Sequence, residues 1–335
     1  MPLTSQAIRN FLTDHLGIAE CRVKPIEKGG SDRHFFRVML MDGRSFIFMR
    51  YGTDVEENAY WAEINRFLTE LDLPVPKIIA YDYRQRFLLI EDLGDEDLHA
   101  QSRAPWSKRR RYYLTALSEI YRLHHHPLTD LPVSLKLCPG YDRALYQWEH
   151  NYFLEHCVGA VCGLELAEFR RLKWAHESDA LIDRLQQVPP CLIHRDFQSQ
   201  NILLRNDRPV FIDFQGMRQG NPFYDLASLI CDPYVTFTDE ERHELITFYY
   251  RVSAPDYALS RFTAHFWEAA TQRLMQALGA YGFLGLQKNK PDFLQHIDGG
   301  LRNLAMAAAN AGNLPVVSEL AQNCLEIREA KKHMA

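Results

Sequence analysis

Residues 191–204 read CLIHRDFQSQNILL and place His, Asp and Asn side chains between two apolar runs. A further apolar run follows a polar turn and ends at Asp213. Apolar runs that flank a short polar turn are typical of a β-hairpin, which would return Asp213 to the side of Asn201. We therefore predict that Asp196, Asn201 and Asp213 share one rim of a site.

This set of side chains suits phosphoryl transfer. One carboxylate can orient and deprotonate an attacking hydroxyl, while two oxygen donors hold Mg²⁺ against the phosphates of ATP. We assign Asp196 as the catalytic base, and Asn201 and Asp213 as the Mg²⁺ ligands. His194 and Asp225 are interpreted as structural supports that satisfy buried backbone groups near the turn.

The sequence offers two other possible metal sites. In a metal hydrolase His194, Asp196 and Asp213 would all bind metal, but the sequence has no HExxH motif to support that reading. The triple histidine at 124–126 ends a predicted helix. Adjacent helical residues point in different directions, so we favour capping of that helix over metal binding.

Composition limits the partners and the compartment. The 335 residues carry a formal net charge of -5, so the basic excess of a nucleic-acid-binding protein is absent. The seven cysteines are scattered without a CxxC pair, which fits a reducing environment. No apolar run is long enough for a membrane span, and the first residues lack the order of a signal peptide. We expect a cytoplasmic monomer with no nucleic-acid or membrane partner.

The first part of the chain is expected to be rich in strands. Ile8, Phe11, Leu12 and Leu16 have the spacing of an amphipathic helix. Strands are then predicted at 21–27, 34–40, 45–51, 77–81 and 86–91, with a helix at 55–71. They would form a five-stranded antiparallel sheet with one helix inserted after its third strand.

Helices dominate the rest of the chain. They are predicted at 107–125, 141–157, 165–187, 239–252, 256–281, 291–309 and 316–332, with strands at 201–205 and 209–213. The fold class is therefore α+β, with two lobes. Residues 1–92 would form a β-rich nucleotide-binding lobe, and residues 93–335 a mainly helical lobe with the catalytic loop and the acceptor pocket.

Three segments carry a family resemblance: IHRDFQSQNILL at 193–204, VFIDFQGMRQGNPFYDLASLI at 210–230 and LPVPKII at 73–79. The spacing HRDxxxxN, hairpin, DF resembles the protein-kinase signature, with Gln215 where glycine is usual. The whole chain is similar to the aminoglycoside phosphotransferase and choline kinase-like superfamily. This resemblance implies a protein-kinase-like fold, the roles given above and Asp225 as a buried support. The chain lacks an APE segment, so the acceptor should be a small molecule.

Two segments of the first lobe are expected to meet the nucleotide. The paired glycines before Ser31 allow close approach of the backbone, so Gly30, Ser31 and Asp32 are predicted to contact phosphates. The last predicted strand of this lobe runs into a connection between the lobes. There the backbone groups of Glu91 and Leu93 are predicted to hydrogen-bond a purine edge.

A cation is also expected near the phosphates. Arg50 ends the third predicted strand, where a kinase places its phosphate-binding lysine. Glu63 on the following helix is its predicted ion-pair partner, with Glu56 or Glu57 as alternatives. Arginine binds phosphate through a planar fork and is not equivalent to the point charge of lysine.

Three acceptor classes remain open. The resemblance is closest to bacterial kinases that phosphorylate the anomeric hydroxyl of N-acetylmuramate or N-acetylglucosamine. It is carried by GGSDRHFFRV at 29–38, TQRLMQALG at 271–279 and KPDFL at 290–294. This likeness implies that Arg273 or Gln272 faces the sugar, although exposure on the helix surface is the simpler explanation for either. Arg195 is a further candidate for contact with the acceptor, with a role as scaffold of the loop as its alternative.

The alternatives are a choline or ethanolamine kinase and an aminoglycoside phosphotransferase. Choline would need an aromatic cage, for which Tyr249, Tyr250, Trp267 and Tyr281 are available. A protein that binds nucleotide without catalysis is the alternative of another class, because Arg50 and Gln215 depart from the usual kinase residues.

Overall fold

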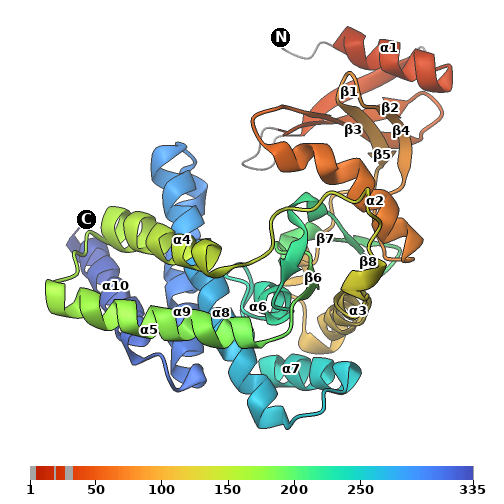
Figure 1. Ribbon diagram of the computed structural model, residues 1–335. Helices are drawn as coiled ribbons and strands as arrows, with labels where there is room; N and C mark the ends of the chain where they lie inside the picture. Colours follow the sequence, from red (N-terminus) through yellow and green to blue (C-terminus); the bar gives the residue numbers. More distant parts are fainter. Residues whose placement is uncertain (1–4, 19, 27–32, 335) are drawn as a thin grey trace. The chain divides into compact units, whose positions relative to one another are not determined.

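A computed structural model describes residues 5–18, 20–26 and 33–334 and confirms the expected α+β class (Figure 1). The chain forms two compact units. The first comprises Met1–Glu96, Pro132–Cys138 and Leu203–Gly216, and the second comprises Asp97–Leu131, Pro139–Ile202 and Met217–Ala335. The division into lobes at residue 92 stays a prediction.

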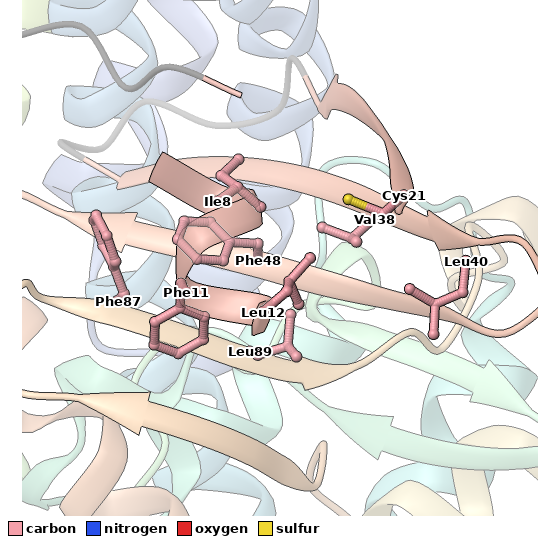
Figure 2. Close-up of a cluster of buried hydrophobic side chains, with 9 residues drawn as sticks. All are labelled: Ile8, Phe11, Leu12, Cys21, Val38, Leu40, Phe48, Phe87 and Leu89. Atoms are coloured by element: carbon pink, nitrogen blue, oxygen red, sulfur yellow. The ribbon is translucent and has the colours of Figure 1, made fainter. Parts of the chain in front are cut away.

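The first unit contains the predicted five-stranded antiparallel sheet, with strand order β1-β2-β3-β5-β4. Its elements are α1 (Ser5–Leu16), β1 (Cys21–Ile26), β2 (Arg33–Leu40), β3 (Ser45–Tyr51), η1 (Glu56–Tyr60), α2 (Trp61–Glu70), β4 (Ile78–Asp82) and β5 (Phe87–Glu91). The apolar face of α1 covers the sheet, where Phe11 packs edge-on against Phe48 and Phe87 (Figure 2). This burial of aromatic surface fixes α1 on the strands.

A charged clamp fixes the segment after β5. The guanidinium of Arg37 on β2 donates to both carboxylate oxygens of Asp95 at 2.8 Å, and its Nε lies 2.8 Å from Asp92 Oδ2. Hydrogen bonds that Arg37 donates to Asp95 and then to Asp92 raise its pKa, although burial opposes them. Leu93, which was predicted to contact the nucleotide, is buried beside these acids.

The second unit is helical. Its longer helices are α3 (Trp106–His124), α4 (Arg143–Phe153), η4 (Leu154–Cys162), α5 (Glu168–Gln187), α6 (Phe223–Ile230), α7 (Asp239–Ser253), α8 (Leu259–Gly282), α9 (Ile297–Ala311) and α10 (Pro315–Met334). The predicted helix at 141–157 is longer than expected, because α4 continues as the π-helix η4. The predicted helix at 291–309 begins instead as the 3-10 helix η8 (Pro291–His296). Among the described residues, no helix combines the length and apolar character needed to cross a membrane.

Two pairs of short strands lie next to the candidate catalytic segment in the sequence. β6 (Cys191–Ile193) pairs antiparallel with β9 (Arg218–Gly220), a pairing that the sequence did not reveal. The apolar runs on either side of the turn form β7 (Ile202–Arg205) and β8 (Arg208–Phe211), which pair as expected. The catalytic segment therefore runs from the end of β6 to the start of β7.

Helix α8 is the centre of the second unit. It contacts α4, α6, α9 and η4, and most of its residues are buried (Figure 1). A Cβ on Gly282 would lie 2.3 Å from the carbonyl oxygen of His156, and one on Gly279 would lie 2.7 Å from Cδ1 of Tyr152. These glycines allow α4 and η4 to pack directly on the helix that carries Gln272 and Arg273.

We expect Gly282→Ala to lower the free energy of unfolding by about 3 kcal/mol, because the carbonyl oxygen that blocks the methyl group belongs to the backbone. Gly299→Ala on α9 is the matched control, since its Cβ would lie at an ordinary 3.4 Å from the oxygen of Pro233. That change should be neutral or stabilising by up to about 1 kcal/mol. Urea denaturation of both variants is the measurement, and equal effects would contradict the close contact.

Candidate functional site

The catalytic loop begins at His194, directly after β6. Asp225 on α6 is fully buried and accepts hydrogen bonds from the backbone N–H of His194 at 2.6 Å and of Arg195 at 2.8 Å. Arg195 has φ of 78°, in the left-handed region that favours glycine. Asp225 therefore holds two amides of a strained turn.

A histidine of the triple run completes this anchor. His124, the last residue of α3, lies 3.0 Å from Asp225 Oδ2 through Nε2 and 2.6 Å from the Tyr249 hydroxyl through Nδ1. It is buried, so its ring is part of the loop support and not the exposed helix cap that we expected. Among the described residues, no group of three or more His, Cys, Asp or Glu is arranged to hold a metal ion.

A second buried carboxylate, missed in the sequence analysis, holds the other end of the loop. Asp232 accepts hydrogen bonds from the backbone N–H of Ser199 at 2.8 Å, from the Ser199 hydroxyl at 2.5 Å and from the N–H of Tyr234 at 2.9 Å. Burial raises the pKa of Asp232, and its hydrogen bonds oppose that shift. Its signal was available, because Asp232 directly follows the run LASLIC at 226–231, just beyond the end of α6 at Ile230.

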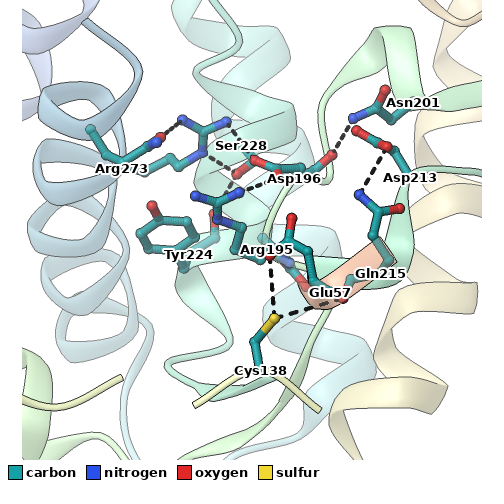
Figure 3. A network of polar contacts seen from close by, with 12 residues as sticks. Glu57, Cys138, Arg195, Asp196, Asn201, Asp213, Gln215, Tyr224, Ser228 and Arg273 are labelled. Atoms are coloured by element: carbon teal, nitrogen blue, oxygen red, sulfur yellow. Dashed lines mark hydrogen bonds and ion pairs between the residues drawn. The ribbon is translucent and has the colours of Figure 1, made fainter. Parts of the chain in front are cut away.

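Between these anchors, Asp196 lies beside two arginines (Figure 3). Its Oδ2 is 2.7 Å from Arg195 Nη1, and its Oδ1 is 3.7 Å from Arg273 Nη2. Arg273 is itself fixed, because it donates to the Ser228 hydroxyl and to Gln276 Oε1, both at 2.7 Å. Burial raises the pKa of the Asp196 carboxyl, but the two guanidiniums outweigh burial and leave that pKa below its usual value. Asp196 is therefore an ionised, oriented carboxylate.

Asn201 is placed by the same loop. Its Nδ2 donates to the backbone carbonyl of Asp196 at 2.9 Å. This bond uses the amide nitrogen and leaves the amide oxygen, which is the atom that a cation would bind. The structure thus brings Asp196 and Asn201 together within the second unit.

Asp213 belongs to the first unit and lies two residues beyond the end of β8. It has φ of 66°, and the next residue, Phe214, is buried against the ring of Trp61 at 4.9 Å. Its Oδ1 accepts a hydrogen bond from Arg33 Nη2 at 2.5 Å. The same oxygen accepts a second one from Gln215 Nε2 at 3.2 Å (Figure 3). Arg33 is a second residue that the sequence analysis missed, and its position at the start of β2 gave no sign of this partner.

Gln272 belongs to a closed buried network. Its Oε1 is 2.6 Å from His150 Nε2, and its Nε2 donates to Glu149 Oε2 at 2.9 Å. Glu149 also accepts hydrogen bonds from the hydroxyls of Tyr141 at 2.9 Å and Tyr224 at 3.1 Å. Both the oxygen and the nitrogen of the Gln272 side-chain amide bond to protein groups. We therefore infer that Gln272 has a supporting role in the site.

The described residues predicted to contact the nucleotide lie in different segments of the first unit. Arg50 is half-buried on β3, Glu91 is half-buried at the end of β5, and Glu63 is on the exposed side of α2. Among the described residues, Arg50 and Glu63 form no ion pair. Glu57 accepts a hydrogen bond from the thiol of Cys138 at 3.4 Å. The predicted phosphate contacts Gly30, Ser31 and Asp32 lie outside the described residues.

The sequence of this chain is similar to those of known proteins over most of its length. Residues 22–263 match the family described as the phosphotransferase enzyme family. An N-acetylmuramate/N-acetylglucosamine kinase of Pseudomonas putida is 26% identical over 303 residues, which cover 89% of this chain and 86% of that protein.

Solved structures show the same fold. A choline/ethanolamine kinase family protein of Mesorhizobium loti has a TM-score of 0.63 at 15% identity, with 97% of this chain and 100% of that chain covered. An aminoglycoside phosphotransferase in its ADP-bound form has a TM-score of 0.60 at 15% identity, with 97% and 99% covered. At these identities the likeness concerns the fold alone.

We expect Arg195→Gly to separate the strain of the turn from the charge of the side chain. Glycine adopts this φ without strain, so thermal stability should change little. Loss of the guanidinium should raise the pKa of Asp196 and move the acid limb of the pH profile of kcat/KM to higher pH. Turnover should fall about 10- to 100-fold through misplacement of the carboxylate.

Arg195→Lys is the control for this experiment, because it keeps the positive charge. Its acid limb should stay nearer that of the wild type. An unchanged acid limb in Arg195→Gly would show that Arg195 does not set the ionisation of Asp196.

The buried His150 should make folding sensitive to acid. Burial lowers its pKa to about 4, from 6.5 in an exposed histidine, so between these values the unfolded chain binds a proton that the folded chain does not. Stability is therefore lost as pH falls, by about 2 kcal/mol from this group between about pH 7 and pH 5. Urea denaturation at both pH values should show a smaller loss in His150→Gln, and an equal loss would contradict the assignment.

Proposed function

Because this chain belongs to the phosphotransferase enzyme family, we propose that it transfers the γ-phosphoryl group of ATP to the anomeric hydroxyl of an amino sugar. The chain is a small-molecule kinase. The observation that carries the proposal is the carboxylate of Asp196, oriented by two arginines on a loop that is anchored at both ends. N-acetylmuramate and N-acetylglucosamine are the proposed acceptors, supported by the name of the Pseudomonas putida relative.

The proposed role of Asp196 follows from its lowered pKa. A carboxylate that holds its proton weakly is a poor base for an unactivated hydroxyl. A weak base is sufficient for phosphoryl transfer through a loose transition state, because the proton leaves the hydroxyl late, as the new P–O bond forms. Asp196 would accept a hydrogen bond from the acceptor hydroxyl, align its oxygen with the phosphorus and take the proton at the end.

Asn201 and Asp213 would hold Mg²⁺. Their amide and carboxylate oxygens are the hard donors that this ion prefers, and few protein ligands are needed beside phosphate oxygens and water. The nitrogen of Asn201 is already bonded, and Asp213 Oδ2 accepts no hydrogen bond from the described part of the chain. When bound, Mg²⁺ neutralises negative charge on the nucleotide phosphates.

The nucleotide and the acceptor would meet different residues. The ADP in the aminoglycoside phosphotransferase supports a nucleotide donor, for which we propose Arg50 and the backbone of Glu91 and Leu93. Arg195 keeps about a quarter of its side chain exposed and is proposed to contact the acceptor. Arg273 is buried, so we propose that it acts through Asp196.

Burial of the aromatic residues favours the amino sugar over choline. Tyr249, Trp267 and Tyr281 are buried in the second unit, and the hydroxyl of Tyr249 is bonded to His124. Such rings are not free to surround a quaternary ammonium group. An aminoglycoside remains the second candidate, since the ADP-bound relative of similar fold is named for that substrate.

We expect Asp196→Asn to lower kcat about 100- to 10,000-fold, the usual range for a lost general base. The KM for ATP should change little, because this carboxylate contacts the acceptor. Asp179→Asn, on an exposed acid of α5, is the matched control and should keep full activity. Steady-state kinetics are the measurement, and undiminished turnover in Asp196→Asn would remove it from the mechanism.

The acceptor is tested by ATP turnover with N-acetylmuramate, N-acetylglucosamine, choline, homoserine and aminoglycosides. The amino sugars should be the preferred acceptors, with phosphorus NMR showing coupling of the phosphate to the anomeric proton. Preferred turnover of choline or an aminoglycoside would replace the proposed acceptor and leave the kinase assignment intact.

A further inference from the structure

Asp213 belongs to a closed ring of hydrogen bonds in the first unit. Arg33 donates through Nη2 to Asp213 Oδ1 at 2.5 Å and through Nη1 to Gln215 Oε1 at 2.7 Å. Gln215 completes the ring, since its Nε2 donates to the same Asp213 oxygen at 3.2 Å. The side chain of Arg33 is 9% exposed and Gln215 is 4% exposed, so little water competes for these bonds.

Gln215 explains why the ring can form. It stands where the protein-kinase signature has glycine, and glycine could bridge nothing. Its backbone is fixed, because the preceding Phe214 packs on Trp61 and its own carbonyl oxygen lies 3.7 Å from the sulfur of Cys138. The Gln215 side chain therefore has one orientation, in which it joins arginine and aspartate.

The ring has an electrostatic consequence for a metal ligand. A guanidinium beside a carboxylate lowers the affinity of that carboxylate for a metal cation, because the two positive charges repel each other. Asp213 is therefore neutralised by Arg33 before a metal arrives. A divalent ion at Asp213 Oδ2 would have to remain beside the guanidinium or replace it.

The position of Arg33 in the sheet indicates where its guanidinium group would move. Arg33 pairs with Tyr51 at one end of the β2–β3 ladder, and the next pair joins His34 with Arg50. Two arginines thus mark the same end of the sheet. A guanidinium fork matches the oxygens of a phosphate group as well as it matches a carboxylate.

We propose that Arg33 binds the nucleotide polyphosphate and rests on Asp213 while no nucleotide is bound. Phosphate oxygens take over the guanidinium, and this transfer exposes the full charge of Asp213 to the metal ion. The nucleotide thereby prepares the site for its own counter-ion. This inference rests on the proposed function, since it requires a nucleotide at this site.

The test uses Arg33→Met and two binding measurements that need no acceptor. Mn²⁺ binding without nucleotide, followed by electron paramagnetic resonance, should become about tenfold tighter, because a neighbouring arginine weakens a carboxylate by roughly that factor or more. ADP binding in the presence of EDTA, followed by calorimetry, should become about tenfold weaker through loss of a charge-assisted contact. Arg44→Met is the control, because this exposed arginine of the same unit pairs with Asp42 and should alter neither value.

The outcomes separate the two proposals. Unchanged or weaker Mn²⁺ binding in Arg33→Met, or unchanged ADP binding, would overturn the role of Arg33 while leaving the kinase assignment in place. A wild-type protein that binds neither ADP nor Mn²⁺ would overturn the proposed function itself. If Arg33→Met does not fold, Arg33→Lys decides, because its point charge cannot bond Asp213 and Gln215 together. In Arg33→Lys, Mn²⁺ binding should be tightened and ADP binding weakened to a smaller extent. If neither affinity changes, the inference is refuted.

Discussion

Asp225 has no exposure to solvent, and its two carboxylate oxygens are shared by the backbone amides of His194 and Arg195 and by the ring of His124. An ionised carboxylate is expensive to bury unless such donors surround it, and the same donors would be unsatisfied without it. The anchor and the loop therefore depend on each other. Asp232 binds Ser199 in a similar way, so α6 and the residues just after it hold the candidate catalytic loop at both ends.

Backbone strain occurs at two residues of the candidate site. Arg195 and Asp213 both have left-handed φ, at 78° and 66°. Each is followed closely by a buried phenylalanine, Phe197 or Phe214, whose packing helps to offset the cost of the strained residue. Strain of this kind persists where the surrounding contacts over-determine the conformation, which is the case for both turns.

Sequence patterns were sufficient for the local features. The sheet, the helix α1 and the hairpin β7–β8 follow from apolar periodicity and turn residues, which are properties of neighbouring positions. Gln272 and Arg273 could not be placed in this way, because their partners Glu149, His150 and Asp196 are far away in sequence. A polar residue on an apolar helix is predicted to be exposed unless its partner is known.

The same limit applies to Arg33. Its bonds to Asp213 and Gln215 join residues that are 180 and 182 positions apart, and no local pattern encodes such a contact. The π-helix η4 was missed for another reason, since its backbone bonding departs from the 3.6-residue period on which the prediction relied. Asp232 differs from both, because its place directly after the run LASLIC at 226–231 was readable in the sequence.

The clamp of Arg37 on two acids has a consequence for the effect of ionic strength. Asp95 is 71% exposed, so dissolved ions screen its attraction to the guanidinium, whereas Asp92 is 5% exposed and largely shielded from them. Concentrated salt should therefore weaken one half of the clamp and spare the other. The backbone at Leu93 would keep its inner attachment in such a medium, and the segment after β5 would hold its form over a wide range of ionic strength.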